Sequence, residues 1–239
     1  MIDEFAKRSA QLEQALFEMR RVVVGQDRAL ERLMVALLSG GHCLLEGVPG
    51  LGKTLTLNTL ARVLGGSFSR IQFTPDLLPS DIVGTRIYLA SKEKFDVEPG
   101  PVLANFVLAD EINRAPAKVQ SAMLEVMQER QVTIGDQSFP APAPFLVMAT
   151  QNPIESEGVY PLPEAQRDRF MMRVPMGYPT VDEEREIVYR MDVEASAAEP
   201  ILDPGDVLAM QRVSGEVFVD QKVVDYALRI VTATRRPGD

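Results

Sequence analysis

The stretch HCLLEGVPGLGKT, residues 42–54, decides the fold. A short apolar run over 42–46 leads into a glycine-rich loop, and a helix is predicted to follow over 53–64. Residues 47–54 fit the pattern G-x-x-x-x-G-K-[ST]. Typical residue frequencies produce such a match in roughly one chain in a hundred of this length, and fewer matches lie between a strand and a helix. The stretch therefore predicts a phosphate-binding loop rather than a chance turn.

Each residue type in the loop has a physical reason. Glycines permit positive φ angles and bring backbone N–H groups up to phosphate oxygens. The following helix points the positive end of its dipole at the same anion. Lysine adds a positive charge on the β- and γ-phosphates, and the threonine hydroxyl suits Mg²⁺. The predicted ATP-binding residues are Gly47, Val48, Pro49, Gly50, Leu51, Gly52, Lys53 and Thr54. Thr54 is also a predicted ligand of Mg²⁺, and ATP and Mg²⁺ are the predicted cofactors.

Two further apolar runs, over 106–109 and 145–150, end in polar residues. In open parallel sheets, ligands bind beyond the carboxyl ends of the strands. Asp110 is therefore predicted to support Mg²⁺, and Glu111 to orient and deprotonate the attacking water. Asn152 is predicted to position that water or the γ-phosphate. The competing interpretations are a solvated strand end for the acidic pair and a simple Asn-Pro turn for Asn152.

Strands and helices alternate along most of the chain, which predicts an α/β fold with a parallel sheet and crossover helices. Further strands are predicted over 67–73 and 169–174, hairpins near 86–97 and 131–139, and helices over 3–20, 26–39, 116–128, 163–168, 181–192, 204–213 and 220–235. No strand signal appears after residue 178. We therefore expect a nucleotide-binding core over 1–178 and a separate helical piece over 179–239.

Composition restricts the class of protein. The formal net charge is −9 over 239 residues, which weighs against binding to nucleic acid, since that depends on Lys and Arg neutralising phosphates. The single cysteine, Cys43, allows no internal disulfide, suits a reducing compartment and is expected to be a small core residue. No apolar run is long enough to cross a bilayer. These features predict a cytoplasmic protein without a membrane span.

Several of these segments together resemble the MoxR family of AAA+ ATPases. They are LLEGVPGLGKT (44–54), QFTPDLLPSDIVGT (72–85), LADEINRAPAKVQSAMLEVMQE (108–129), ATQNPIESEGVYPLPEAQRDRF (149–170) and Val24-Gly25-Gln26. The resemblance spans about 22–178 and includes many residues between the nucleotide motifs. It implies a P-loop AAA+ core with a five-stranded parallel sheet sandwiched by helices, and a C-terminal helical lid. It also implies a ring, generally hexameric, with ATP bound between neighbouring subunits.

The resemblance assigns further roles to particular residues. Gly25 and Gln26 would lie near the adenine, Asp110 and Glu111 would form the Walker B pair, and Asn152 would be the first sensor. Arg169 would be the arginine finger offered to the neighbouring subunit's γ-phosphate.

Two departures from the family pattern affect these assignments. Position 167 is arginine where the family usually has an apolar residue, so Arg167 is a second candidate for the finger. A surface arginine paired with Asp168 or Glu164 is the alternative for Arg169. The second sensor arginine has no match, so the chain is expected to be a fragment with a truncated lid.

The function implied is Mg²⁺-dependent ATP hydrolysis in a homo-oligomeric ring that remodels or matures a client protein. By resemblance, the client is often a partner with a von Willebrand factor A domain, or a metalloenzyme. One alternative is a DNA-associated motor of helicase type, which the acidic charge and the lack of basic and aromatic interleaving in the hairpins disfavour. Another is a nucleotide-gated scaffold without turnover, which the intact Asp110-Glu111 pair disfavours.

Overall fold

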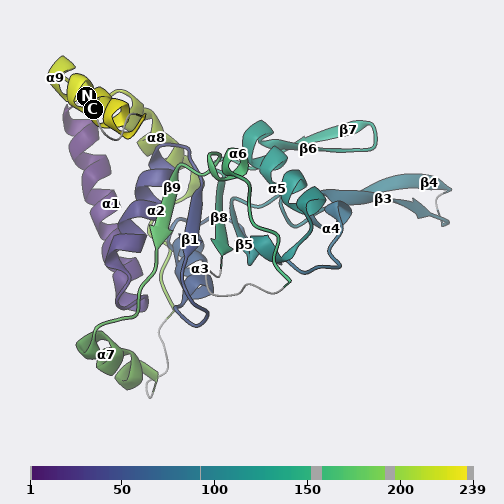
Figure 1. Cartoon of the computed structure of the whole chain (residues 1–239), viewed down its shortest axis with the longest axis horizontal. Helices are drawn as coiled ribbons and strands as arrows, with labels where there is room; N and C mark the ends of the chain where they lie inside the picture. The colour runs from purple at the N-terminus through teal and green to yellow at the C-terminus, as the bar shows by residue number, and fades with distance from the viewer. Residues whose placement is uncertain (1, 92, 152–157, 192–196, 236–239) are drawn as a thin grey trace.

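A five-stranded parallel sheet forms the centre of the molecule (Figure 1). The computed structural model describes residues 2–91, 93–151, 158–191 and 197–235. The sheet strands are β1 (Cys43–Glu46), β2 (Phe68–Gln72), β5 (Phe106–Asp110), β8 (Leu146–Gln151) and β9 (Met172–Pro175). Their order is β2-β5-β8-β1-β9, and every neighbouring pair is parallel. The predicted five-stranded parallel sheet is therefore confirmed.

Helices cover both faces of this sheet, and two hairpins lie outside it. The helices are α1 (Ile2–Val22), α2 (Asp27–Leu38), α3 (Lys53–Val63), α4 (Pro79–Val83), the 3-10 turn η1 (Ile112–Arg114), α5 (Ala117–Glu129), α6 (Glu164–Arg167), α7 (Val181–Met191), α8 (Pro204–Gly215) and α9 (Gln221–Arg235). The hairpins pair β3 (Gly84–Leu89) with β4 (Lys94–Pro99), and β6 (Gln131–Ile134) with β7 (Gln137–Pro140). Both hairpins project from the α4–α5 side of the sheet, away from α1 (Figure 1).

Alternation of side chains along the strands gives the molecule two hydrophobic cores. Cys43 and Leu45 face one side, where they pack with residues of α1, α2, α3 and α8. Leu44, between them, faces the other side and packs with residues of α4 and α5. Because the strands are buried on both faces, they read as continuous apolar runs rather than as alternating ones. This double coverage is the α/β sandwich that the sequence predicts, and Cys43 is the buried core residue expected.

The parallel register brings the polar strand ends to one edge of the sheet. Gln72 of β2 lies beside Asp110 of β5, and Leu45 of β1 lies beside Thr150 of β8. β2 is the edge strand next to β5, and β1 lies between β8 and β9. The glycine-rich loop after β1 and the acidic pair after β5 therefore share the carboxyl edge.

Among the differences from the sequence prediction are α4 and the start of β9. The short helix α4 precedes the first hairpin, and its first turn is capped by the Asp81 carboxylate, which accepts from Leu78 N–H at 2.8 Å. The strand predicted over 169–174 begins only at Met172, because Arg169 N–H and Phe170 N–H donate to carbonyls three residues back and extend the turn of α6.

The segment after residue 178 is helical in its described part, as predicted. Val207 and Met210 of α8 join the core formed by α1, α2 and α3. The boundary expected near residue 178 remains a prediction. No helix in the described ranges is both long and apolar enough to span a membrane.

Candidate active site

The glycine-rich loop connects the end of β1 to the start of α3, as the sequence predicts. Gly50 and Gly52 have φ angles of 87° and 76°, which L side chains rarely adopt. A Cβ atom added at either position would meet no atom within 4 Å. Leu51, between them, packs against the core and fixes the loop to the domain. The loop thus presents bare backbone to open space, where a phosphate group can approach it.

Lys53 and Thr54 are the first two residues of α3, where the helix dipole favours an anion. The Lys53 amine donates to the Gly47 carbonyl, which holds it over the loop. Burial lowers the pKa of Lys53, while the charges of Asp110 and Glu111 act in the opposite direction and favour its cationic form.

Loop and strand ends line a common cleft of about 430 Å³, within the size range of small-molecule sites. Its lining residues are Pro49, Gly50, Gly52, Lys53, Thr54, Leu55, Arg70, Gln72, Asp110 and Glu111. The remaining predicted loop residues, Gly47, Val48 and Leu51, belong to the same turn. Gly47 is required by packing, since a Cβ there would lie 2.7 Å from the Met176 carbonyl oxygen. Two motifs separated by more than fifty residues therefore form one site.

The donor set of this cleft fits Mg²⁺. The Thr54 hydroxyl and the Asp110 carboxylate both line it, and Thr54 is exposed there. Hydroxyl and carboxylate oxygens are hard ligands of the kind that Mg²⁺ binds beside the phosphates of a nucleotide. The cleft thus offers both of the predicted ligand oxygens to one ion.

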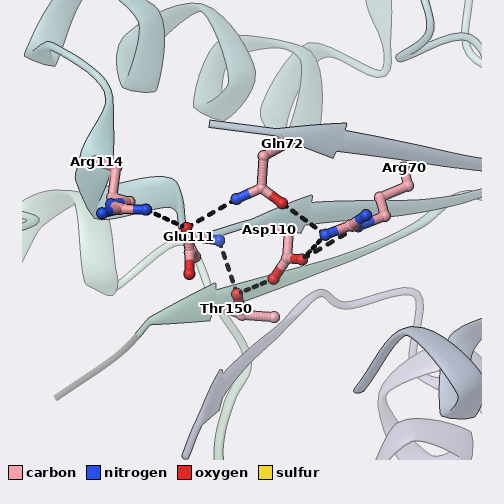
Figure 2. A network of polar contacts seen from close by, with 6 residues as sticks. All are labelled: Arg70, Gln72, Asp110, Glu111, Arg114 and Thr150. Carbon is pink, nitrogen blue, oxygen red and sulfur yellow. Dashed lines mark hydrogen bonds and ion pairs between the residues drawn. The ribbon is translucent and has the colours of Figure 1, made fainter. Parts of the chain in front are cut away.

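Asp110 has a partner on each carboxylate oxygen (Figure 2). Arg70 donates to Oδ2 through Nη2 at 2.7 Å and through Nε at 3.1 Å. The Thr150 hydroxyl donates to Oδ1 at 2.7 Å. The orientation of the carboxylate is therefore determined by the two strands on either side of β5.

Glu111 has an unusual backbone conformation, with φ 57° and ψ 48° in the left-handed region. Its N–H donates to the Thr150 hydroxyl at 2.8 Å, so a single hydroxyl orients both acidic residues (Figure 2). Its Oε2 accepts from Gln72 Nε2 at 2.8 Å and from Arg114 Nη1 at 3.0 Å. Non-glycine residues are held in this region only where their surroundings compensate, and such residues cluster at functional sites.

Four residues of this network were missed by the sequence prediction: Arg70, Gln72, Arg114 and Thr150. Arg70 and Gln72 are two positions apart on β2, so both side chains point to the same face. Polar and apolar residues alternate over 70–73 in the sequence, but the local sequence does not show which strand lies beside β2. The contact of Gln72 with Glu111 depends on β2 lying beside β5 in the observed register.

The predicted adenine-side residues lie next to the loop. Gln26 is buried and donates from Nε2 to the Gly177 carbonyl at 3.2 Å. Residue 176 is in turn joined to β1, because its N–H donates to the Glu46 carbonyl at 2.7 Å. Gly25 has a φ of 74°, and a Cβ there would lie 3.2 Å from Glu183 of α7. The adenine role of Gly25 and Gln26 remains a prediction.

Asn152, the predicted first sensor, lies outside the described residues. The structure describes the strand that leads to it, which ends at Gln151. The residue of β8 that touches the acidic pair is Thr150. The role assigned to Asn152 remains a prediction.

Arg167 and Arg169 are both exposed and lie outside the set of residues that line the cleft. Arg169 lines a separate groove with Glu125 and Glu129 of α5. Arg167 lines another, which also contains Arg173. Within the described part of the chain, Arg169 forms no ion pair with Asp168 or Glu164. The arginine-finger role of Arg169, with Arg167 as the second candidate, remains a prediction.

Comparisons with known proteins extend these observations. The family model described as "ATPase family associated with various cellular activities (AAA)" matches residues 42–172. A crystal structure of a Cytophaga hutchinsonii protein superposes with a TM-score of 0.91 at 48% identity, covering 98% of this chain and 72% of that one. The fold of the described core is therefore that of an AAA ATPase.

Two curated relatives refine the family. "Chaperone MoxR1" of Mycobacterium tuberculosis is 65% identical over 95% of this chain, which spans 60% of the length of that protein. "Uncharacterized protein YeaC" of Bacillus subtilis is 45% identical over 94% of this chain, which spans 71% of it. The glycine-rich loop, the acidic strand end and these similarities lead to one conclusion. The chain belongs to the MoxR family of AAA ATPases.

Proposed function

We propose that this chain binds ATP with Mg²⁺ in the described cleft and hydrolyses it to ADP and phosphate. The observation that carries the proposal is that the glycine-rich loop and the acidic pair line the same 430 Å³ cleft. Lys53 and the loop N–H groups would bind the phosphates, and Thr54 and Asp110 would hold the ion. Mg²⁺, when bound, supplies positive charge that neutralises the phosphate oxygens as the reaction proceeds.

Glu111 would act as the general base in this reaction. It would orient the attacking water and accept its proton on a carboxylate oxygen. The Thr150 hydroxyl fixes the backbone of Glu111, while Gln72 and Arg114 hold Oε2. These contacts support the role because they hold a proton acceptor in the lining of the cleft. Asn152 is proposed to position the same water.

Assembly into a ring is proposed to complete the site. An exposed arginine outside the subunit's own cleft can serve the γ-phosphate of a neighbour and make hydrolysis depend on assembly. Arg169 is the proposed finger, with Arg167 as the second candidate. We propose a homo-oligomer, by family resemblance a hexamer, whose lid begins after residue 178.

A chaperone-like activity on a client protein is proposed for the ring. The support is the similarity to a protein named as a chaperone. A client with a von Willebrand factor A domain, or a metalloenzyme undergoing maturation, is the proposed substrate class. The cytoplasm is the proposed location, since the one cysteine of the sequence, Cys43, suits a reducing compartment.

Two variants with a matched control test the proposal. Lys53→Ala should weaken binding of a fluorescent ATP analogue roughly 10- to 100-fold, because a charge-assisted contact is lost. Glu111→Gln should keep that affinity while phosphate release falls by roughly 100-fold or more. Lys118→Ala, which removes an exposed lysine of α5, should alter neither quantity. Unchanged affinity in Lys53→Ala, or undiminished phosphate release in Glu111→Gln, would refute the assigned roles.

The alternatives give different results in the same assays. Stimulation of phosphate release by single-stranded or duplex DNA would favour a DNA-associated motor. Tight ATP binding with no phosphate release by the assembled wild-type ring would favour a scaffold.

A further inference from the structure

Arg70 makes the closest cationic contact to the carboxylate that is proposed to hold the metal. Its guanidinium reaches Asp110 Oδ2 through two nitrogens, at 2.7 Å and 3.1 Å, and Nη2 also donates to Gln72 Oε1 at 2.6 Å. The Arg70 side chain is 46% exposed, whereas that of Asp110 is 16% exposed. A partly exposed cation is thus bound to a largely buried anion in the lining of the cleft.

The position of this guanidinium conflicts with a metal ion. Thr150, which is 1% exposed, donates its only hydroxyl proton to Oδ1, whereas the donors on Oδ2 belong to a side chain that is 46% exposed, so Oδ2 is the oxygen whose partner can leave for a new ligand. Both donors on Oδ2 come from Arg70. A divalent ion arriving there would meet the guanidinium charge at close range, where two cations repel strongly.

The Arg70 side chain can also move away from Asp110. It lies on β2, the edge strand of the sheet, and its exposed side chain can leave Oδ2 for solvent without displacing core residues. The same contact has a function before metal arrives, because it balances an acidic residue that is followed directly by Glu111. Without the Arg70 contact, less positive charge would offset the repulsion between the Asp110 and Glu111 carboxylates.

We propose that Arg70 is the intramolecular counter-ion of Asp110 in the nucleotide-free protein, and that Mg²⁺ entering with nucleotide has to displace its guanidinium from Oδ2. This inference rests on the proposed nucleotide site. Arg70 is then a positioning residue that sets the Mg²⁺ concentration at which nucleotide is held.

The first test is a Mg²⁺ titration of the whole chain at constant ionic strength, with binding of N-methylanthraniloyl-ADP as the readout. Arg70→Gln should lower the Mg²⁺ concentration for half-maximal binding roughly two- to fivefold, the change expected when a partly exposed ion pair no longer competes. Arg62→Gln removes an exposed arginine at the far end of α3, about 14 Å along the helix from Lys53, and should match wild type. An unchanged or increased Mg²⁺ requirement in Arg70→Gln would overturn the displacement.

The second test does not depend on nucleotide. Urea unfolding in EDTA is compared for wild type, Arg70→Gln, Asp110→Asn and the double variant. If Arg70 is the counter-ion, the double variant should lose less stability than the sum of the two single losses. Additive losses would overturn the counter-ion role. If wild type failed to bind the labelled ADP, the proposed function and the displacement would both be refuted, while coupling in EDTA would still establish the counter-ion.

Discussion

The Thr150 hydroxyl contacts both Asp110 and Glu111. The substitution Thr150→Val removes this hydroxyl with little change in the shape of the side chain. The hydroxyl accepts from Glu111 N–H at 2.8 Å and donates to Asp110 Oδ1 at 2.7 Å, in a side chain that is 1% exposed. Valine can do neither. The substitution therefore leaves the part-buried Glu111 N–H without its acceptor and frees one oxygen of the carboxylate.

The expected loss of stability is about 3 kcal/mol. An unsatisfied buried donor costs about 1–3 kcal/mol, and a hydrogen bond to a charged group contributes about 1.5–3 kcal/mol. The lower part of the second range applies, because Asp110 can recover some hydration from the cleft. Phosphate release should fall more steeply than nucleotide affinity, since Glu111 loses the contact that holds its left-handed backbone while the loop is unchanged.

Urea unfolding and steady-state phosphate release measure the two effects. Thr150→Ser keeps the hydroxyl and should retain most of both. Thr59→Val, at a buried threonine of α3, supplies the cost of the same exchange elsewhere in the core. If Thr150→Val were no more destabilising than Thr59→Val, the bridging hydroxyl would not carry the energy assigned to it.

Three further changes examine other parts of the molecule. Mixing Arg169→Ala with Glu111→Gln subunits should restore part of the hydrolysis that each lacks, and no recovery would point to Arg167 or to a structural role. Gly52→Ala should cost about 1–2 kcal/mol of stability, because φ is 76° there, and should weaken ATP binding in a titration; unaltered affinity would contradict the open loop. Burial lowers the pKa of His42 from 6.5 to about 4. The unfolded chain therefore takes up the proton first, so the stability conferred is complete above about pH 6.5 and falls by about 3 kcal/mol towards pH 4. Urea unfolding at pH 7.5 and pH 5 should show about 2 kcal/mol of this loss in wild type but not in His42→Gln; equal pH dependence would refute it.

The phosphate-binding loop and the parallel sheet could be predicted because their signals are local. A loop of fixed glycine spacing needs only its own residues and the two elements that flank it. An apolar run ending in Asp110-Glu111 is likewise read directly. The prediction that these two segments share one edge needed only the general rule for parallel strands, and both line the observed cleft.

The network around the acidic pair could not be predicted in the same way. Arg70 and Gln72 reach the pair only because β2 lies beside β5, and strand order is decided by long-range packing. The left-handed backbone of Glu111 is also a tertiary effect, since glutamate has no intrinsic preference for it. Thr150 reads in the sequence as one more core residue of an apolar strand.

In the proposed reaction, the left-handed backbone of Glu111 lowers local stability at a residue whose carboxylate is needed for activity. Glycine or asparagine would adopt φ 57° more readily than glutamate and would remove part of a strain of about 1–3 kcal/mol. A laboratory selection for thermal stability alone is therefore expected to favour glycine or asparagine at position 111, which removes the carboxylate. A selection for turnover is expected to keep glutamate and with it the lower stability, which is the usual trade-off between stability and activity at an active site.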